Sequence, residues 1–236
     1  MIDFEERIKS HQYVGVQTKE KGIADIFKLV YGWMFLGLTL SGGIAYLVHF
    51  YGLFKYLEPM IIILIVAELA LVIVLSFCFK KLSFAAALLM FLVYAALNGA
   101  TLSVIFLVYK ISTIQNAFFL TSGLFAVMAV YGTVTKADCS KIGSICTFGL
   151  FGIVIASLVN IFLKSSGLDW AISLIAIAVF TGLTMWDAQK IKALANVEDK
   201  LDKETVRKLS VMGALMLYLD FVNLFLHLLR LMGRKK

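Results

Sequence analysis

The sequence is short of charged residues, of proline and of cysteine. Charged residues make up 16% of its 236 residues and hydrophobic ones 61%, whereas soluble domains carry about 25% charged and about 45–50% apolar residues. A soluble core of this size cannot bury so many apolar side chains, so lipid must solvate much of the surface. The single proline argues against a loop-rich fold, and the three cysteines include no C-x-x-C pair, which argues against a metal or redox site. These shortages exclude an ordinary soluble domain.

The first 28 residues lack the apolar stretch of a secretory signal. They contain five basic and five acidic residues, so the first hydrophobic helix is expected to act as an uncleaved insertion signal. The sequence also lacks a basic stripe interleaved with aromatic residues, which would be typical of a nucleic-acid-binding surface. The formal charge of +7 lies instead in short segments between apolar runs, and we expect no nucleic-acid partner.

Seven apolar runs approach the roughly 20 residues that a transmembrane helix needs. They are Leu29–Phe50, Pro59–Phe79, Phe84–Tyr109, Ala117–Val134, Gly143–Leu163, Trp170–Trp186 and Ser210–Met232. The sequence therefore predicts an all-α integral membrane protein of about seven transmembrane helices. We divide it into an N-terminal segment (1–28), a membrane domain (29–232) and a basic tail (233–236). The polar stretch from Asp187 to Leu209 is predicted to continue the sixth helix and then form a solvated loop.

The distribution of positive charge predicts the orientation. Seven spans place 15 of the 22 lysines and arginines on the side of the N-terminus and 7 on the other. Because lysine and arginine are enriched in cytoplasmic loops, the N-terminus is expected in the cytoplasm. The basic tail conflicts with this count, and a re-entrant last segment would remove the conflict. The last segment is long enough to cross, so we expect seven spans and a lipid bilayer as the immediate partner.

Three carboxylates fall within the apolar runs or at their ends. Glu68 lies near the middle of the second run, Asp187 closes the sixth, and Asp220 lies well inside the seventh. An ionisable group at such a position costs a few kcal/mol, and it persists only with partners or water nearby. Each of these carboxylates is therefore a functional hypothesis.

The seventh run carries a polar stripe. Its polar and small residues are separated by 7, 3, 4 and 3 positions, which places them on one face of a helix: Gly213, Asp220, Asn223, His227 and Arg230. A stripe of this length cannot face lipid, so the last helix is expected at the centre of the bundle, facing other helices or a watery cavity. The alternative is a set of interhelical hydrogen bonds that only holds the bundle together.

Other runs offer groups that could complement this stripe. Tyr94, Asn98 and Thr101 share one face of the third run, and Thr184 lies one turn before Asp187. We take Asp187 and Asp220 as the candidate pH-sensing and gating residues. The candidate pore-lining or supporting residues are Glu68, Asn98, Thr184, Asn223, His227 and Arg230. Two small-residue spacings, Gly37-x-x-x-Ser41 and Ala95-x-x-x-Gly99, suit close helix packing.

The chemistry depends on whether Asp187 and Asp220 meet. Two carboxylates in contact at low dielectric cannot both be ionised, so they would share a proton. Loss of that proton, or arrival of a cation, would separate the helices or fill the gap, and oxygen ligands suit a hard cation such as Ca²⁺. The predicted boundaries put Asp187 near the cytoplasmic surface and Asp220 about 15 Å deeper. The sequence leaves open whether they meet.

Three stretches resemble the Bax inhibitor-1, or transmembrane Bax inhibitor motif, family. They read GLTMWDAQKI at 182–191, LYLDFVNLFL at 217–226 and LNGATLS at 97–103. The resemblance implies a seven-helix fold with the last helix surrounded by the other six. It also implies a pH-sensitive calcium leak governed by an aspartate pair at the positions of Asp187 and Asp220. Ala188 replaces a common threonine, which leaves both carboxylates in place.

The leading hypothesis is thus a calcium, or more generally cation, leak channel or transporter in the inner (plasma) membrane of a bacterium. Ca²⁺ would be the permeant or bound ion, with Asp187 and Asp220 as its ligands. Bacterial relatives include a regulator of the membrane-bound FtsH protease, so the alternative is a membrane-embedded regulator that binds such a protease. We do not expect an enzyme. The sequence has no Walker loop, H-E-x-x-H or G-x-S-x-G motif, and its aspartates lack the flanking residues of intramembrane aspartyl proteases.

Overall fold

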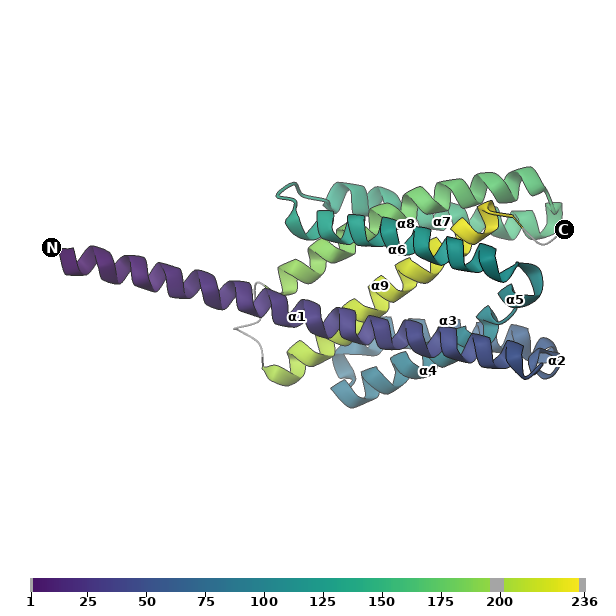
Figure 1. Cartoon of the computed structure of the whole chain (residues 1–236), viewed down its shortest axis with the longest axis horizontal. Helices are drawn as coiled ribbons and strands as arrows, with labels where there is room; N and C mark the ends of the chain where they lie inside the picture. Colours follow the sequence, from purple (N-terminus) through teal and green to yellow (C-terminus); the bar gives the residue numbers. More distant parts are fainter. Residues whose placement is uncertain (1, 196–201, 234–236) are drawn as a thin grey trace.

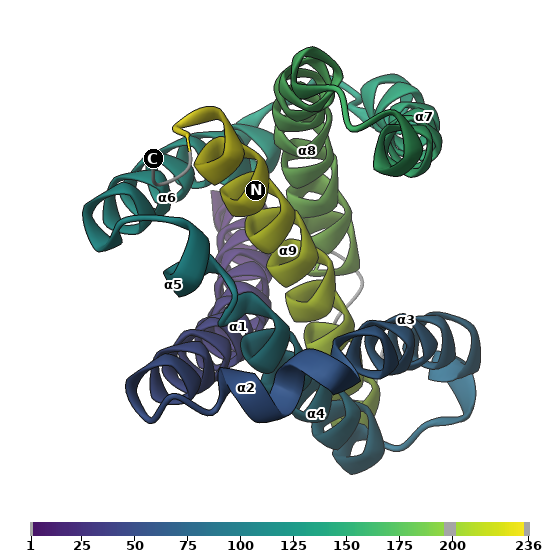
Figure 2. The ribbon, with the colours of Figure 1, turned by 90° about the vertical axis from the view of Figure 1, so that its right-hand side faces the viewer.

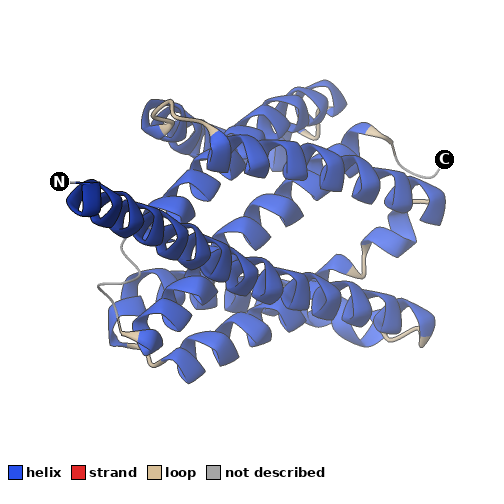
Figure 3. Ribbon diagram, turned by 60° about the vertical axis from the view of Figure 1, so that its left-hand side comes forward, coloured by secondary structure: helices blue, strands red, loops and turns tan. Residues whose placement is uncertain are grey.

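The computed structural model describes residues 2–195 and 202–233, and within these ranges the chain forms helices and short connections only (Figure 1 and Figure 3). The long helices are α1 (Ile2–Phe50), α3 (Ile61–Cys78), α4 (Phe84–Leu102), α6 (Ile111–Val134), α7 (Ser140–Leu163), α8 (Ser166–Ala195) and α9 (Lys203–Leu231). The short ones are α2 (Phe54–Leu57), η1 (Glu58–Met60), η2 (Phe79–Lys81) and α5 (Ile105–Val108). The basic tail 234–236 lies outside the described residues.

Seven stretches of the described chain are long and apolar enough to cross a membrane, which confirms the predicted fold class. They are Ala24–Phe50, Phe54–Cys78, Phe84–Val108, Ile111–Val134, Ser140–Leu163, Ser166–Ala195 and Lys203–Leu231. Figure 1 shows α9 running from the end of the bundle near the N-terminal half of α1 to the opposite end, where the C-terminus lies. We call these the N-terminal end and the C-terminal end of the bundle. The last segment therefore crosses the bundle and is not re-entrant.

The last two helices extend beyond the predicted apolar runs. The sixth run ends at Trp186, and α8 continues beyond it to Ala195. Its extra turns bury Ile191 and Ala195 against the rest of the bundle, which explains why helix persists beyond the apolar run. Asp187 therefore lies inside its helix, and the prediction that it closes the helix was wrong.

The last helix begins at Lys203, seven residues before the predicted start. Asp202 caps it, because its Oδ2 accepts a 3.0 Å hydrogen bond from the backbone N–H of Thr205, as N-cap aspartates commonly do. Hydrogen bonds from the side chain and backbone of Thr205 hold the pKa of the Asp202 carboxyl below its usual value. The predicted continuation of the sixth helix beyond Asp187 is confirmed as far as Ala195. The predicted loop is wrong for 203–209, which belong to α9, and residues 196–201 lie outside the described residues.

The last helix is central. It packs against α1, α4, α6 and α8, while α3 packs on α4 and α7 on α8 (Figure 2). In the most apolar window of each span, 67% of α9 is buried, against 6% of the α2–α3 span and 11% of α7. Four helices thus form the immediate shell of α9, and two others lie mostly toward the surrounding lipid.

Glycines set the closest helix contacts. A Cβ at Gly99 would lie 2.6 Å from the backbone oxygen of Ser41, so the two predicted small-residue spacings face one another between α1 and α4. A Cβ at Gly132 of α6 would lie 2.1 Å from the backbone oxygen of Met185 in α8. Such contacts resemble the small-residue packing of membrane helices. The contact between Gly132 and Met185 fixes the position of α8 two residues before Asp187.

We expect Gly132→Ala to destabilise the bundle, because the added methyl group would push α6 away from the backbone of α8. Overpacking of this kind costs about 1–3 kcal/mol. The matched control is Gly123→Ala on the same helix, where an added Cβ meets no atom within 4 Å. Thermal unfolding in detergent, followed by size-exclusion chromatography, should show a lower midpoint for Gly132→Ala alone. Equal midpoints for the two variants would contradict this packing.

Candidate functional site

Two carboxylates predicted from the sequence come together inside the bundle. Asp187 of α8 has an exposed fraction of 7%, and Asp220 of α9 has 4%. The two groups interact electrostatically, and the hydroxyl of Thr184, one turn before Asp187, contacts the Asp220 carboxyl. The longer α8 makes this possible, because it carries the chain past Asp187 instead of ending there. The structure thus brings together the three predicted residues of α8 and α9.

A lysine that the sequence analysis did not select completes this site. The Nζ atom of Lys190 lies 2.6 Å from Oδ1 of Asp187 and 3.7 Å from the ring centroid of Trp186. The spacing of three residues on a helix is a known ion-pair spacing. In the sequence, Lys190 counts only toward the positive charge on the cytoplasmic side, because it follows the sixth apolar run, which ends at Trp186.

The charges of the site do not balance by themselves. Asp187, Asp220 and Lys190 carry two potential negative charges and one positive charge. Within the described residues, Oδ2 of Asp220 is buried and has no hydrogen-bond partner. An unpartnered buried carboxylate oxygen is costly, so the site suits a proton or a cation at this atom.

The site does not form a complete calcium cage. The described part of the chain contains no group of three or more histidine, cysteine, aspartate or glutamate side chains placed to hold a metal ion. Ca²⁺ takes 6–8 oxygen ligands, so Asp187 and Asp220 would supply only part of its coordination and water would supply the rest.

Glu68 lies in a second polar cluster, which links four helices. Its Oε2 accepts a 3.2 Å hydrogen bond from Nδ2 of Asn98, and its Oε1 lies 2.9 Å from Oγ1 of Thr101. Oδ1 of Asn98 accepts a 2.9 Å hydrogen bond from the hydroxyl of Tyr218 in α9, and Oγ of Ser41 in α1 lies 2.6 Å from the same hydroxyl. Glu68 is thus tied through α4 to the central helix, as a supporting residue would be.

Tyr218 is the residue of this cluster that sequence reasoning missed. Its aromatic ring stands among leucines in the seventh run and looks like part of the apolar face. The sequence feature that could have identified it is its position two residues before Asp220. That spacing turns Tyr218 toward α1 and α4, while Asp220 faces α8. It is fully buried, with ring contacts to Phe91 and Tyr94.

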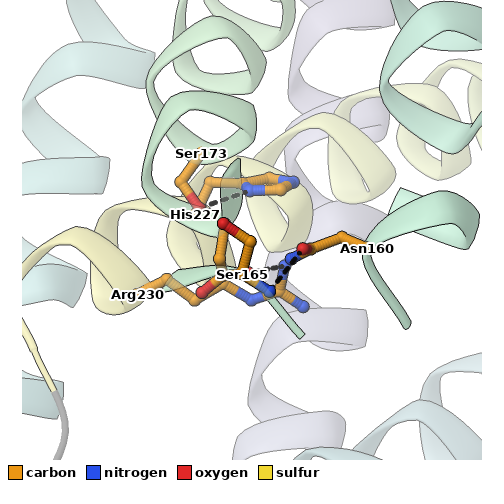
Figure 4. A network of polar contacts seen from close by, with 6 residues as sticks. Asn160, Ser165, Ser173, His227 and Arg230 are labelled. Carbon is orange, nitrogen blue, oxygen red and sulfur yellow. Dashed lines mark hydrogen bonds and ion pairs between the residues drawn. The ribbon is translucent and has the colours of Figure 1, made fainter. Parts of the chain in front are cut away.

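The rest of the predicted stripe lies toward the C-terminal end of the bundle. Nδ2 of Asn223 donates to the backbone oxygen of Leu219, Nδ1 of His227 lies 3.4 Å from Oγ of Ser173, and Arg230 pairs with Asp169 at 3.8 Å. Figure 4 shows His227 and Arg230 beside side chains from α7 and α8. The stripe on α9 thus serves two regions: the carboxylate pair and a separate polar group near the C-terminal end.

We expect Tyr218→Phe to weaken the bundle, because it leaves Oδ1 of Asn98 buried without its donor. The loss should be about 1–2 kcal/mol, in the range for a buried hydrogen bond between membrane helices. Tyr131→Phe, at a tyrosine that is 53% exposed, serves as the control. A denaturant titration in mixed micelles measures the difference. Equal unfolding free energies for the two variants would argue against the cluster as a structural element.

Comparison with known proteins finds relatives that match most of the chain. The chain is 45% identical over 219 residues to the inner membrane protein YbhL of Escherichia coli K12, covering 91% of this chain and 94% of YbhL. It is 40% identical over 228 residues to an uncharacterized protein of Borreliella burgdorferi, covering 94% and 95% of the two chains. It is 39% identical to an uncharacterized protein of Rickettsia prowazekii over 229 residues, covering 93% and 94%.

The chain also matches a protein family over most of its length. Residues 24–236 match the family described as "Inhibitor of apoptosis-promoting Bax1". This range begins where the first membrane span begins and includes all seven spans. The chain therefore belongs to the Bax inhibitor-1 family of multi-pass membrane proteins.

Proposed function

We propose that this protein is a pH-sensitive leak pathway for cations, with Ca²⁺ as the permeant ion, and that Asp187 and Asp220 form its gate. The observation that carries the proposal is the interacting pair of buried carboxylates, one of which has an unpartnered oxygen. An intramembrane ionisable group generally marks an ion or proton path. Here two such groups meet on the central helix and on a helix of its immediate shell.

The proposed gate works through charge balance. Lys190 compensates one carboxylate, and one proton on the pair compensates the other, so the site is neutral and α8 and α9 stay packed. When that proton leaves, the pair carries one net negative charge in a medium of low dielectric. That charge favours either separation of the helices or a hydrated cation between them. The same change therefore opens the path and attracts the ion that uses it.

Location and orientation complete the proposal. The relative YbhL is named an inner membrane protein, and we place this chain in the same kind of membrane. The excess of lysine and arginine favours a cytoplasmic position for the N-terminal end of the bundle, toward which Asp187 lies in α8. The gate would then respond to cytoplasmic acidity.

The test is calcium flux into proteoliposomes as a function of pH. A gate that responds to one proton changes its open population by at most about tenfold per pH unit. Because loss of the proton opens the proposed gate, wild-type flux should rise with pH along a curve no steeper than that. Asp220→Asn and Asp187→Asn should flatten it. Asp138→Asn, at an exposed aspartate of the α6–α7 loop, is the control and should keep it. Unchanged pH dependence in both gate variants would exclude this gate.

A second candidate function is regulation of a membrane protease such as FtsH. Figure 1 shows that the N-terminal half of α1 extends beyond the other helices, as a segment that contacts another protein would. Removing residues 2–20 should then abolish co-purification with the protease and leave calcium flux intact. Loss of flux with retained co-purification would contradict this second function.

A further inference from the structure

Two cavities lie at the C-terminal end of the bundle, between α7, α8 and α9. The outer cavity has a volume of about 780 Å³ and includes Ser165, Ser173 and Lys164 in its lining. The inner cavity has a volume of about 470 Å³ and reaches Leu150, near the middle of α7. Both cavities are lined by Asn160, Ile161, Asp169 and Arg230, so they meet at these side chains. Together they form one crevice, which we call the α7–α9 crevice.

Polar groups continue along the crevice into the membrane domain. Figure 4 shows Asn160 of α7, Ser173 of α8, and His227 and Arg230 of α9 close together. Ser173 lines the outer cavity, His227 lines the inner one, and Asn160 and Arg230 line both. Ser157 of α7 and Asn223 of α9 line the inner cavity. Arg230 and Asn223 are seven residues apart, so polar side chains line about 10 Å of the axis of α9. Such a row is costly against hydrocarbon and favourable against water.

The charges of the inner cavity nearly cancel. Arg230 and Asp169, which face each other from α9 and α8, form an ion pair at 3.8 Å. The ring of His227 stacks on Phe180 of α8 and lies beside Ser173. The remaining polar groups there, Ser157 and Asn223 among them, are neutral hydroxyls and amides. Neutral oxygen donors in a cavity of this size suit a hydrated cation better than a bare one.

The inner cavity also comes close to the gate. Asn223 lies three residues after Asp220 on α9, a rise of about 4.5 Å along the helix axis. Asp187 lies eight residues before the end of α8, which is at the N-terminal end of the bundle. The crevice approaches the carboxylate pair from the C-terminal end. One turn of α9 separates Asn223, which lines the inner cavity, from Asp220.

The geometry points to the α7–α9 crevice as the second half of the cation path: a water-filled cleft that leads a hydrated cation from the C-terminal end of the bundle to within one helical turn of Asp220. This inference rests on the proposed leak function and adds the route to it. The ion enters or leaves between α7 and α9. The gate remains the carboxylate pair of Asp187 and Asp220, one helical turn of α9 beyond Asn223 in the crevice.

Thiol accessibility tests the water in the crevice. Ser157→Cys and Asn223→Cys place thiols in the inner cavity, and Ile155→Cys places one on the side of α7 that is 62% exposed and faces lipid. Full-length protein in proteoliposomes is treated with a methanethiosulfonate that carries a quaternary ammonium group, and each thiol is read by peptide mass spectrometry. Because the reagent needs an ionised thiol in water, we expect both crevice thiols to react and the Ile155→Cys thiol to stay unmodified. The native buried Cys146 is the internal reference.

Calcium flux through the labelled protein tests the route. A fixed positive charge in the crevice should lower calcium flux about tenfold in Ser157→Cys, and labelled wild type should keep its flux. Labelling with a methanethiosulfonate that carries a negatively charged sulfonate should lower calcium flux through Ser157→Cys less. Crevice thiols that stay unmodified, as they would if lipid filled the cleft, overturn the inference. Modification of the crevice thiols without loss of calcium flux also overturns the inference, provided that the pH dependence of wild-type flux is intact. Absence of any flux in unlabelled wild type would instead refute the proposed leak itself.

Discussion

The structure depends on two buried carboxylates where α8 meets α9, one of which pairs with a partly exposed lysine. Asp187 and Asp220 are almost fully buried, and Lys190 lies within ion-pair distance of one of them. Burying charge in a membrane protein is costly unless every charge finds a partner. One oxygen of Asp220 has none among the described residues. The packing of the two most buried spans is therefore coupled to whatever proton or cation occupies that place.

The position of α9 makes this coupling reach the whole bundle. The helix that carries Asp220 also carries Tyr218, which is hydrogen-bonded to Asn98 of α4 and lies 2.6 Å from Ser41 of α1. Gly132 presses the backbone of α6 against α8 two residues before Asp187. A change at the carboxylate pair thus acts on helices that contact α1, α4 and α6. The outer helices α3 and α7, which are mostly exposed in their apolar windows, have fewer such ties to the centre.

Most of the architecture could be predicted from the sequence, because lipid imposes simple rules on length and polarity. Seven apolar runs gave seven spans, and the polar stripe on the last run gave the central helix. The end of α8 could not be predicted from hydropathy, because its last turns combine lysines with buried residues such as Ile191. Lys190 was missed for the same reason. Tyr218 was missed because a tyrosine among leucines shows its hydroxyl partners only when α1 and α4 are in place.

The polar residues Asn223, His227 and Arg230 show a further limit of pattern reading. Their spacing places them on the face of Asp220, but it does not reveal that they line a cavity whose lining includes neither Asp187 nor Asp220. Helical periodicity describes one helix, whereas the partners of a face depend on where the neighbouring helices end. The long α7 and the start of α8 at Ser166 decide that those residues line a crevice.

The measurement that tests the account most directly is the infrared difference spectrum of the protein in lipid between acidic and alkaline pH. If Asp187 and Asp220 hold one proton between them, wild type should lose a carboxylic-acid C=O band as the pH rises. That band should be absent from Asp187→Asn and from Asp220→Asn, because each variant breaks the same pair. A band that persists unchanged in both variants would show that the two carboxylates do not act together, and would contradict the account.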